Sequence, residues 1–367
     1  SNRNIVISLT SLTFLTFLNK MTTTVPLIYS FPEFLGVADA VADHIITAQN
    51  QTLYNTTDLD QIELIKQRSG NTPSHTPRHS QSGIELPSTT ASGALNTPLS
   101  RNGSSPKLNN NNGNTTTTSS SGRPKKEKKI QKKQEVRFKI AISGGSLIKI
   151  LHQGLLPRQK YIEWDKWDIY FADERLVPFE SPDSNYGQAK REIFDLITGD
   201  KKPRIFHVDE SLIDDSQEAA DEYEKQLINN FAKKDSVKLP LFDLFLLGCA
   251  PDGHIASLFP NHGEQLREKL AWVLPVSNAP LGPENRITLS IPVICHSARV
   301  TFVVEGLTKA PIIKTIMERP EKGLPSSIVN EGAAGRVSWF VDDDALNDLF
   351  DITKKKYKYL SIPEPSH

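Results

Sequence analysis

The order of apolar segments is the feature that most limits how this 367-residue chain can fold. Short runs rich in Val, Ile, Phe and Leu alternate with segments whose apolar residues recur every three or four positions. The expected strands cover residues 25–30, 136–143, 167–172, 206–208, 239–247, 286–293, 299–305 and 336–341, and the expected helices cover residues 32–47, 147–155, 185–196, 216–231, 309–317 and 344–350. This alternation predicts an α/β fold with a mostly parallel sheet covered by helices on both faces.

A long polar segment interrupts the alternation. Between Arg68 and Gly122 the chain consists mainly of Ser, Thr, Asn, Pro and Gly. Such a segment buries too little apolar surface to offset the entropy of ordering it, so we expect it to be disordered. The expected organisation is a single discontinuous domain, residues 25–54 plus 135–353, with an N-terminal extension (1–24), a low-complexity insert (55–134) and a tail (354–367).

The first residues resemble a targeting segment. Residues 5–17 are apolar and follow Arg3, but the run is too short to span a bilayer comfortably. We expect Met21 to be the natural start and residues 1–20 to be an extension, with a targeting segment as the alternative.

The only cysteines, Cys249 and Cys295, are too few for a disulfide-rich secreted fold. We therefore expect no membrane contact and a cytoplasmic location, with a nuclear location as the alternative.

A basic run, Arg123 to Lys133, ends the insert. The whole chain is balanced, with 43 Lys+Arg and 43 Asp+Glu, so its net charge does not point to nucleic acid or to a membrane. The local run predicts either contact with nucleic acid or an import receptor, or a solvated flank that keeps the insert soluble. The sequence leaves the oligomeric state open.

The most informative stretch is residues 247–260, in which Asp252 and His254 stand on a Gly/Pro-rich turn directly after an apolar run. Ligands of parallel sheets bind outside the carboxyl ends of the strands, where this turn is expected to lie. A histidine is suited to general acid–base chemistry near neutral pH, and Asp252 is close enough to orient its ring or tune its pKa. His254 is therefore the central candidate, although a lone histidine is more often structural.

A second turn, Ser143-Gly144-Gly145-Ser146, joins an expected strand to an expected helix. Glycines allow the backbone to approach a ligand closely, and a helix N-terminus favours anions. The turn lacks the spacing of a P-loop or a dinucleotide fingerprint. It predicts a phosphate site, with an unoccupied tight turn as the alternative.

Charged side chains end several other expected elements. Asp173 and Arg175 follow the strand 167–172, and Arg286 and Lys309 stand at the ends of later elements. A guanidinium can bind phosphate or stabilise a developing oxyanion. The alternative for Arg175 is an ion pair with one of its neighbours or with Asp183. The alternative for Arg286 and Lys309 is an ordinary surface charge.

Together, an anion-binding turn, several cations and one base describe a site for a small phosphorylated metabolite. The sequence contains no G-x-S-x-G nucleophile elbow and no H-E-x-x-H zinc pair. We therefore expect no metal and no cofactor, and attack by a water molecule that a base activates.

The ordered part of the chain resembles the 6-phosphogluconolactonase family. The resemblance rests on five segments in sequence: residues 143–146, 173–178 with Ser184-Asn185, 251–254 with 257–260, 286–289, and 324–327. It implies a Rossmann-like α/β fold, no metal, and hydrolysis of a phosphorylated sugar lactone, 6-phospho-D-glucono-1,5-lactone, in the oxidative pentose phosphate pathway. In this family His254 is expected to activate water, Arg175 to stabilise the oxyanion or hold the substrate, and the 144–146 turn with Arg286 to bind the phosphate.

Two positions depart from the family pattern. This chain has Ala250 where the family usually has glycine, and Ile255 where it usually has threonine. A methyl group at residue 250 would disturb the turn if that position needed a positive φ. The long insert resembles a fungal lactonase-like branch linked to tRNA distribution. A non-catalytic binding or trafficking protein is therefore one alternative, and a glucosamine-6-phosphate deaminase, whose pattern continues differently after residues 253–256, is another.

Overall fold

The computed structural model describes residues 26–70, 135–232 and 237–360. Within them a seven-stranded sheet has the order β1-β10-β9-β6-β2-β3-β5, and every pair is parallel. Its strands are β1 (Leu27–Phe31), β2 (Phe138–Ile142), β3 (Trp167–Phe171), β5 (Arg204–Phe206), β6 (Leu244–Leu247), β9 (Val300–Val304) and β10 (Val337–Asp342). The predicted parallel α/β architecture is confirmed.

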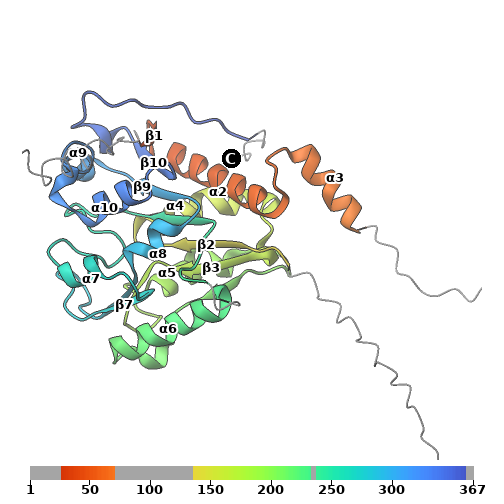
Figure 1. Cartoon of the computed structure of the whole chain (residues 1–367). Helices are drawn as coiled ribbons and strands as arrows, with labels where there is room; N and C mark the ends of the chain where they lie inside the picture. Colours follow the sequence, from red (N-terminus) through yellow and green to blue (C-terminus); the bar gives the residue numbers. More distant parts are fainter. Residues whose placement is uncertain (1–25, 71–134, 233–236, 361–367) are drawn as a thin grey trace, which may run out of the picture. The chain divides into compact units, whose positions relative to one another are not determined.

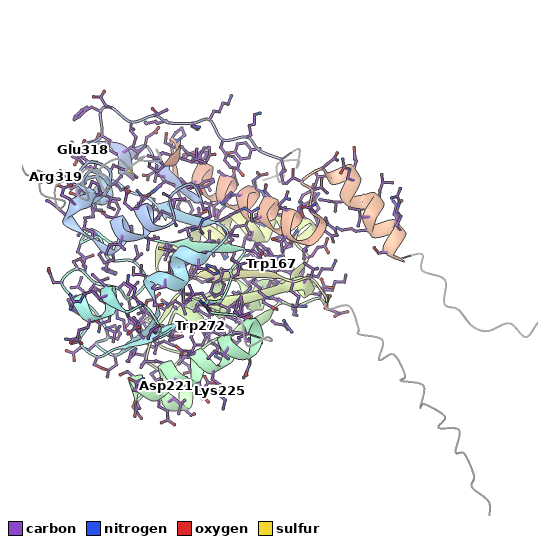
Figure 2. The ribbon with its side chains drawn as sticks, viewed as in Figure 1. Trp167, Asp221, Lys225, Trp272, Glu318 and Arg319 are labelled. Carbon is purple, nitrogen blue, oxygen red and sulfur yellow. The ribbon has the colours of Figure 1, made fainter. Side chains whose placement is uncertain are left out.

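Helices cover both faces of this sheet, as Figure 1 shows for α2 and α4 on one side and α6 on the other. The α-helices are α2 (Phe34–Tyr54), α3 (Leu59–Gly70), α4 (Ser146–Leu155), α5 (Asn185–Glu192), α6 (Ser216–Phe231), α7 (Gly263–Arg267), α8 (Ile291–His296), α9 (Ala310–Glu318) and α10 (Pro325–Gly332). Figure 2 shows Asp221 and Lys225 on the outer side of α6, whereas Trp167 lies inside. Polar side chains thus remain on the solvent side of a helix that covers the sheet.

The sheet separates two hydrophobic cores because successive strand residues point to opposite faces. In β2, Phe138, Ile140 and Ile142 pack with α2 and α4, whereas Ala141 packs with the core that contains α6, α8 and α9. Both faces of the central strands are therefore buried, which explains why these strands read as almost continuous apolar runs.

A small second sheet was not predicted. It has the order β4-β8-β7, formed by β4 (Asp173–Arg175), β8 (Arg286–Leu289) and β7 (Val273–Val276), all antiparallel. The single strand expected over 286–293 is confirmed for residues 286–289 and wrong beyond them, because the chain turns at Ser290 into α8, which has a proline in its first turn. The charged segment 173–175 is thus a strand of its own and not the end of β3.

The start of the predicted insert is helical. Residues 55–70 were expected to belong to the low-complexity insert, but α3 continues to Gly70, and Ile62 is buried. An ion pair of 2.6 Å between Lys66 Nζ and Glu163 Oε1 fixes α3 to the loop before β3. The rest of the predicted insert, including Arg123–Lys133, and the whole predicted N-terminal extension (1–24) lie outside the described residues.

The C-terminal segment follows the edge strand β1. Lys354 forms a parallel bridge with Ile28, and Lys355 N donates to Ile28 O at 2.8 Å. The buried carboxylate of Asp43 accepts hydrogen bonds from Tyr357 Oη at 2.8 Å and from Leu360 N at 3.1 Å. As far as residue 360, the predicted tail therefore packs on the domain and covers a sheet edge. The helix expected over 344–350 is only a 3₁₀ turn, η7 (Asp344–Leu346).

The strand order places a crevice between β2 and β6. After β2 the chain continues outward through β3 and β5, whereas after β6 it continues in the opposite direction through β9 and β10. The loops after two such strands diverge and leave space at the carboxyl edge of the sheet. These loops are the Ser143–Ser146 turn and the segment that contains His254.

Candidate active site

A cleft of about 150 Å³ opens at this crevice. It gathers seven of the predicted site residues, which come from the turn after β2, the strand β4, the loop after β6 and the 3₁₀ turn η5 (Leu307–Lys309). They are Gly144, Gly145, Ser146, Asp173, Arg175, His254 and Lys309. Asp252 lies behind His254, and Arg286 is not among the lining residues.

Asp252 holds the His254 ring in a defined tautomer. His254 Nδ1 lies 2.7 Å from Asp252 Oδ1, and the same oxygen accepts the His254 backbone N–H at 3.0 Å. An ionised carboxylate can only accept, so Nδ1 carries the proton and Nε2 has a free lone pair. Burial lowers the pKa of His254 below its usual value, and the negative charge of Asp252 partly opposes this shift. His254 is therefore a neutral base at neutral pH.

The turn after β2 exposes backbone donors to the cleft. No side chain in the described part of the protein caps the first turn of α4, and Gly145 at its N-cap has φ +72°, a conformation that favours glycine. At Gly144 a Cβ atom would lie 1.9 Å from Asn185 Oδ1, so only glycine fits there. An uncapped helix N-terminus with a glycine approach is suited to bind a phosphate.

Two cations border the same cleft. Arg175 Nη1 donates to the main-chain oxygen of Asp183 at 3.1 Å, and its buried Nε has no hydrogen-bond partner within the described residues. Within that part of the chain Arg175 forms no ion pair, so the alternative of an ion pair with a neighbouring acidic residue or with Asp183 is wrong there. Lys309 Nζ donates to Cys249 O at 2.7 Å. A buried N–H without a hydrogen-bond partner is energetically costly.

Arg286 has a different position from the one expected for a phosphate ligand. It is 3% exposed, and its guanidinium donates to Pro283 O at 2.9 Å and also to Leu281 O. Its Nη1 lies 3.5 Å from Ser257 Oγ, and its charge stands 5.3 Å from the Phe259 ring centre. These contacts fix the loop before β8 behind the cleft. Phosphate binding by Arg286 stays a prediction from the family resemblance.

Three polar residues that sequence reasoning did not assign support the site. Glu174 accepts the backbone N–H groups of Arg175, Asn185 and Tyr186 at 2.8, 2.7 and 2.8 Å. Ser257 Oγ donates to Asp173 Oδ2 at 2.7 Å, and Asn185 contacts both Asp173 and Gly144. All three stand inside the matched motifs, but apart from the bond to the adjacent Arg175 their contacts join residues 11 to 84 positions apart, which spacing does not reveal.

The two departures from the family pattern fit the structure. Within the described residues the non-glycine positions with positive φ are Asn55, Ala256 and Asn261, so Ala250 does not need glycine. Ile255 is 1% exposed in the hydrophobic core, and its N–H and C=O both pair with Leu258. Glycine is needed instead at Gly253, where φ is +88° and a Cβ atom would lie 3.0 Å from Leu324 Cδ1.

No group of three or more His, Cys, Asp or Glu side chains in the described residues is arranged to hold a metal ion. No helix in the same residues is long and apolar enough to cross a membrane.

Comparisons with known proteins agree with the motifs. The family described as "Glucosamine-6-phosphate isomerases/6-phosphogluconolactonase" matches residues 122–339. "6-phosphogluconolactonase-like protein 1" of Saccharomyces cerevisiae is 61% identical over 92% of this chain and 98% of its own length. "Probable 6-phosphogluconolactonase" of Schizosaccharomyces pombe is 46% identical over 58% of this chain and 83% of its own.

The fold also matches solved structures. 6-Phosphogluconolactonase from Trypanosoma cruzi superimposes with a TM-score of 0.54 over 89% of this chain and 98% of that protein, at 20% identity. At this identity the likeness concerns the fold alone. On the strength of the family match and the yeast relatives, the chain belongs to the 6-phosphogluconolactonase family.

Proposed function

We propose that this protein hydrolyses 6-phospho-D-glucono-1,5-lactone to 6-phosphogluconate, as a step of the oxidative pentose phosphate pathway. The observation that carries the proposal is the His254–Asp252 pair, which faces a cleft that also contains an uncapped helix N-terminus. A neutral base and an anion-binding turn in one cleft are suited to a phosphorylated substrate that water attacks. The two yeast relatives named above carry lactonase or lactonase-like names.

In the proposed reaction His254 Nε2 takes a proton from water, and the hydroxide oxygen bonds to the lactone carbonyl carbon. Asp252 stabilises the imidazolium that forms. The carbonyl oxygen becomes an oxyanion, which the positive charge of the Arg175 guanidinium stabilises. The tetrahedral intermediate then breaks the bond to the ring oxygen, which receives the proton from His254. The product is an open-chain carboxylic acid, which ionises.

The substrate phosphate is proposed to bind at the Gly144–Ser146 turn, with Lys309 beside it. Cys249 also borders the cleft, but burial raises the pKa of its thiol to about 12, so a covalent thiolate route is disfavoured. Water is therefore the proposed nucleophile.

The test is an assay of the purified full chain with freshly prepared lactone, corrected for spontaneous hydrolysis. We expect enzyme-dependent hydrolysis by wild type and a loss of about 10²-fold or more in kcat for His254→Ala, since general-base catalysis contributes about 10²–10⁴-fold. His296→Ala is the matched control, because His296 is exposed and does not line the cleft. If folded wild-type protein is as inactive as His254→Ala, the hydrolase proposal is wrong and a non-catalytic binding role takes its place.

A further inference from the structure

Asn185 lies where three parts of the candidate site meet. It is the first residue of α5 and is 2% exposed. Its backbone N–H donates to Glu174 Oε1 at 2.7 Å, and its side-chain Nδ2 donates to the main-chain oxygen of Asp173 at 3.0 Å and to Asp173 Oδ1 at 3.3 Å. Its Oδ1 lies against Gly144, where a Cβ atom would be only 1.9 Å away. One amide therefore contacts both the anion-binding turn and the strand β4.

These contacts fix the carboxylate of Asp173. Oδ1 accepts from Asn185, and Oδ2 accepts from Ser257 Oγ at 2.7 Å. Each carboxylate oxygen thus has its own buried donor, so rotation of the group breaks at least one hydrogen bond. Asp173 is 4% exposed and borders the cleft. Its orientation toward the cleft is set by residues from two other segments.

The charge of Asp173 also acts on its neighbours. The charged groups that interact with it are Glu174 on its own strand, His254 on the loop after β6 and Arg286 on β8. Its negative charge stabilises the imidazolium of His254. A fixed Asp173 therefore supports the protonated state that His254 must reach when it takes a proton from water.

We infer that Asn185 is a positioning residue for hydrolysis: it holds Asp173 toward the cleft and couples that carboxylate to the anion-binding turn at Gly144. This inference rests on the proposed lactonase function. Asn185 acts through Asp173, so its loss lowers turnover more than it weakens substrate binding.

The first experiment is Asn185→Asp, which keeps the size of the side chain and replaces the Nδ2 donor with a carboxylate oxygen about 3.3 Å from Asp173 Oδ1. Two carboxylates at that distance share a proton, and one of their pKa values rises strongly. We expect kcat to fall by about 10-fold or more and a new ionisation to enter the profile of kcat/KM against pH. A profile that superimposes on that of wild type, with kcat unchanged, overturns the inference.

Asn330→Asp is the matched control. Asn330 is also buried, accepts a hydrogen bond from Trp339 Nε1 at 3.0 Å, and does not line the cleft. The same isosteric change there is expected to lower thermal stability and leave the pH profile of the folded enzyme unchanged. If Asn330→Asp reproduces the new ionisation, the effect does not come from Asp173 and the inference fails.

Crystal structures of wild type and Asn185→Ala at pH 8 test the positioning without any turnover. We expect the Asp173 carboxylate to leave its wild-type orientation, and an unmoved carboxylate contradicts the inference. Asn185→Asp replaces the alanine variant if the latter does not fold. If the wild type does not hydrolyse the lactone, the proposed function is wrong. The positioning of Asp173 by Asn185 is then still tested by the crystal structures, because they do not depend on turnover.

Discussion

The two loops that form the cleft are built in different ways. The turn after β2 offers backbone N–H groups, and it depends on what is missing: side chains at Gly144 and Gly145 and a cap on α4. The loop after β6 depends on the side chains that are present, with Asp252 bound to both the ring and the backbone of His254. This contrast suggests that the turn binds and the loop reacts. Substitutions should therefore affect KM and stability in the turn, and kcat in the loop.

The largest effect is expected for Asp252→Asn. The substitution removes the acceptor that fixes the His254 tautomer, so kcat is expected to fall by about 10²-fold or more, as in other carboxylate–histidine pairs. Asp252 raises the pKa of His254 and burial lowers it, so without the charge the pKa falls further below 6.5. The acid limb of kcat/KM should then move to lower pH while the maximum falls. The profile is measured from pH 4 to 9, and an unchanged kcat would show that Asp252 is dispensable.

A smaller effect, in stability and KM, is expected for Gly144→Ala. The new methyl group meets Asn185 Oδ1, and overpacking of this kind costs about 1–3 kcal/mol. Urea denaturation and substrate titration measure the free energy of unfolding and KM.

Gly145→Ala is the companion variant to Gly144→Ala. Among the described residues no atom lies within 4 Å of a Cβ at residue 145, so its cost of about 1–3 kcal/mol comes from the backbone conformation alone, φ +72° and ψ −140°. An equal KM for wild type and both variants would contradict a binding role of the turn.

The smallest effect on turnover is expected for Glu174→Gln, because Glu174 does not line the cleft and instead joins β4 to the start of α5. Glutamine has one acceptor oxygen for three backbone N–H groups, and each buried donor left unsatisfied costs about 1–3 kcal/mol. Burial raises the pKa of Glu174 to about 7, from 4.5 in the unfolded chain. The folded state therefore binds a proton more tightly, and the contribution of Glu174 to the free energy of unfolding falls as the pH rises from 4.5 to 7.

Glu174→Gln removes this slope, so the stability difference from wild type should narrow over the same pH range. Urea denaturation at several pH values measures it. A difference that stays constant with pH would show that Glu174 does not titrate in this range.

Local pattern was sufficient for much of the fold and of the site. The strands β2, β3 and β6 are buried on both faces, so their apolar runs identify them without tertiary information. His254, Asp252 and the Gly144–Ser146 turn follow such strands directly, so strand position predicts their place in the crevice. These predictions use only residues that are close in sequence.

Long-range contacts account for what the sequence did not predict. The strand β4 has three residues and exists because it pairs with β8, more than 100 residues later, so no local pattern identifies it. Among the described side chains of α3 only Ile62 is both apolar and buried. The sequence of α3 does not reveal that Lys66 pairs with Glu163, which lies beyond the insert. Burial of Arg286 behind Phe259 likewise depends on the packing of another loop.

The sequence by itself therefore determined the class of fold and the family, and it predicted which residues form the candidate base and the candidate anion-binding turn, because each depends on local periodicity or on a short motif. The tertiary structure alone decided how the side chains of the cleft are oriented: the tautomer of His254, the burial of Arg175 Nε, and the fixed carboxylate of Asp173. The physical reason is that a hydrogen bond depends on distance and direction in space, which residues far apart in sequence acquire only when the sheet assembles.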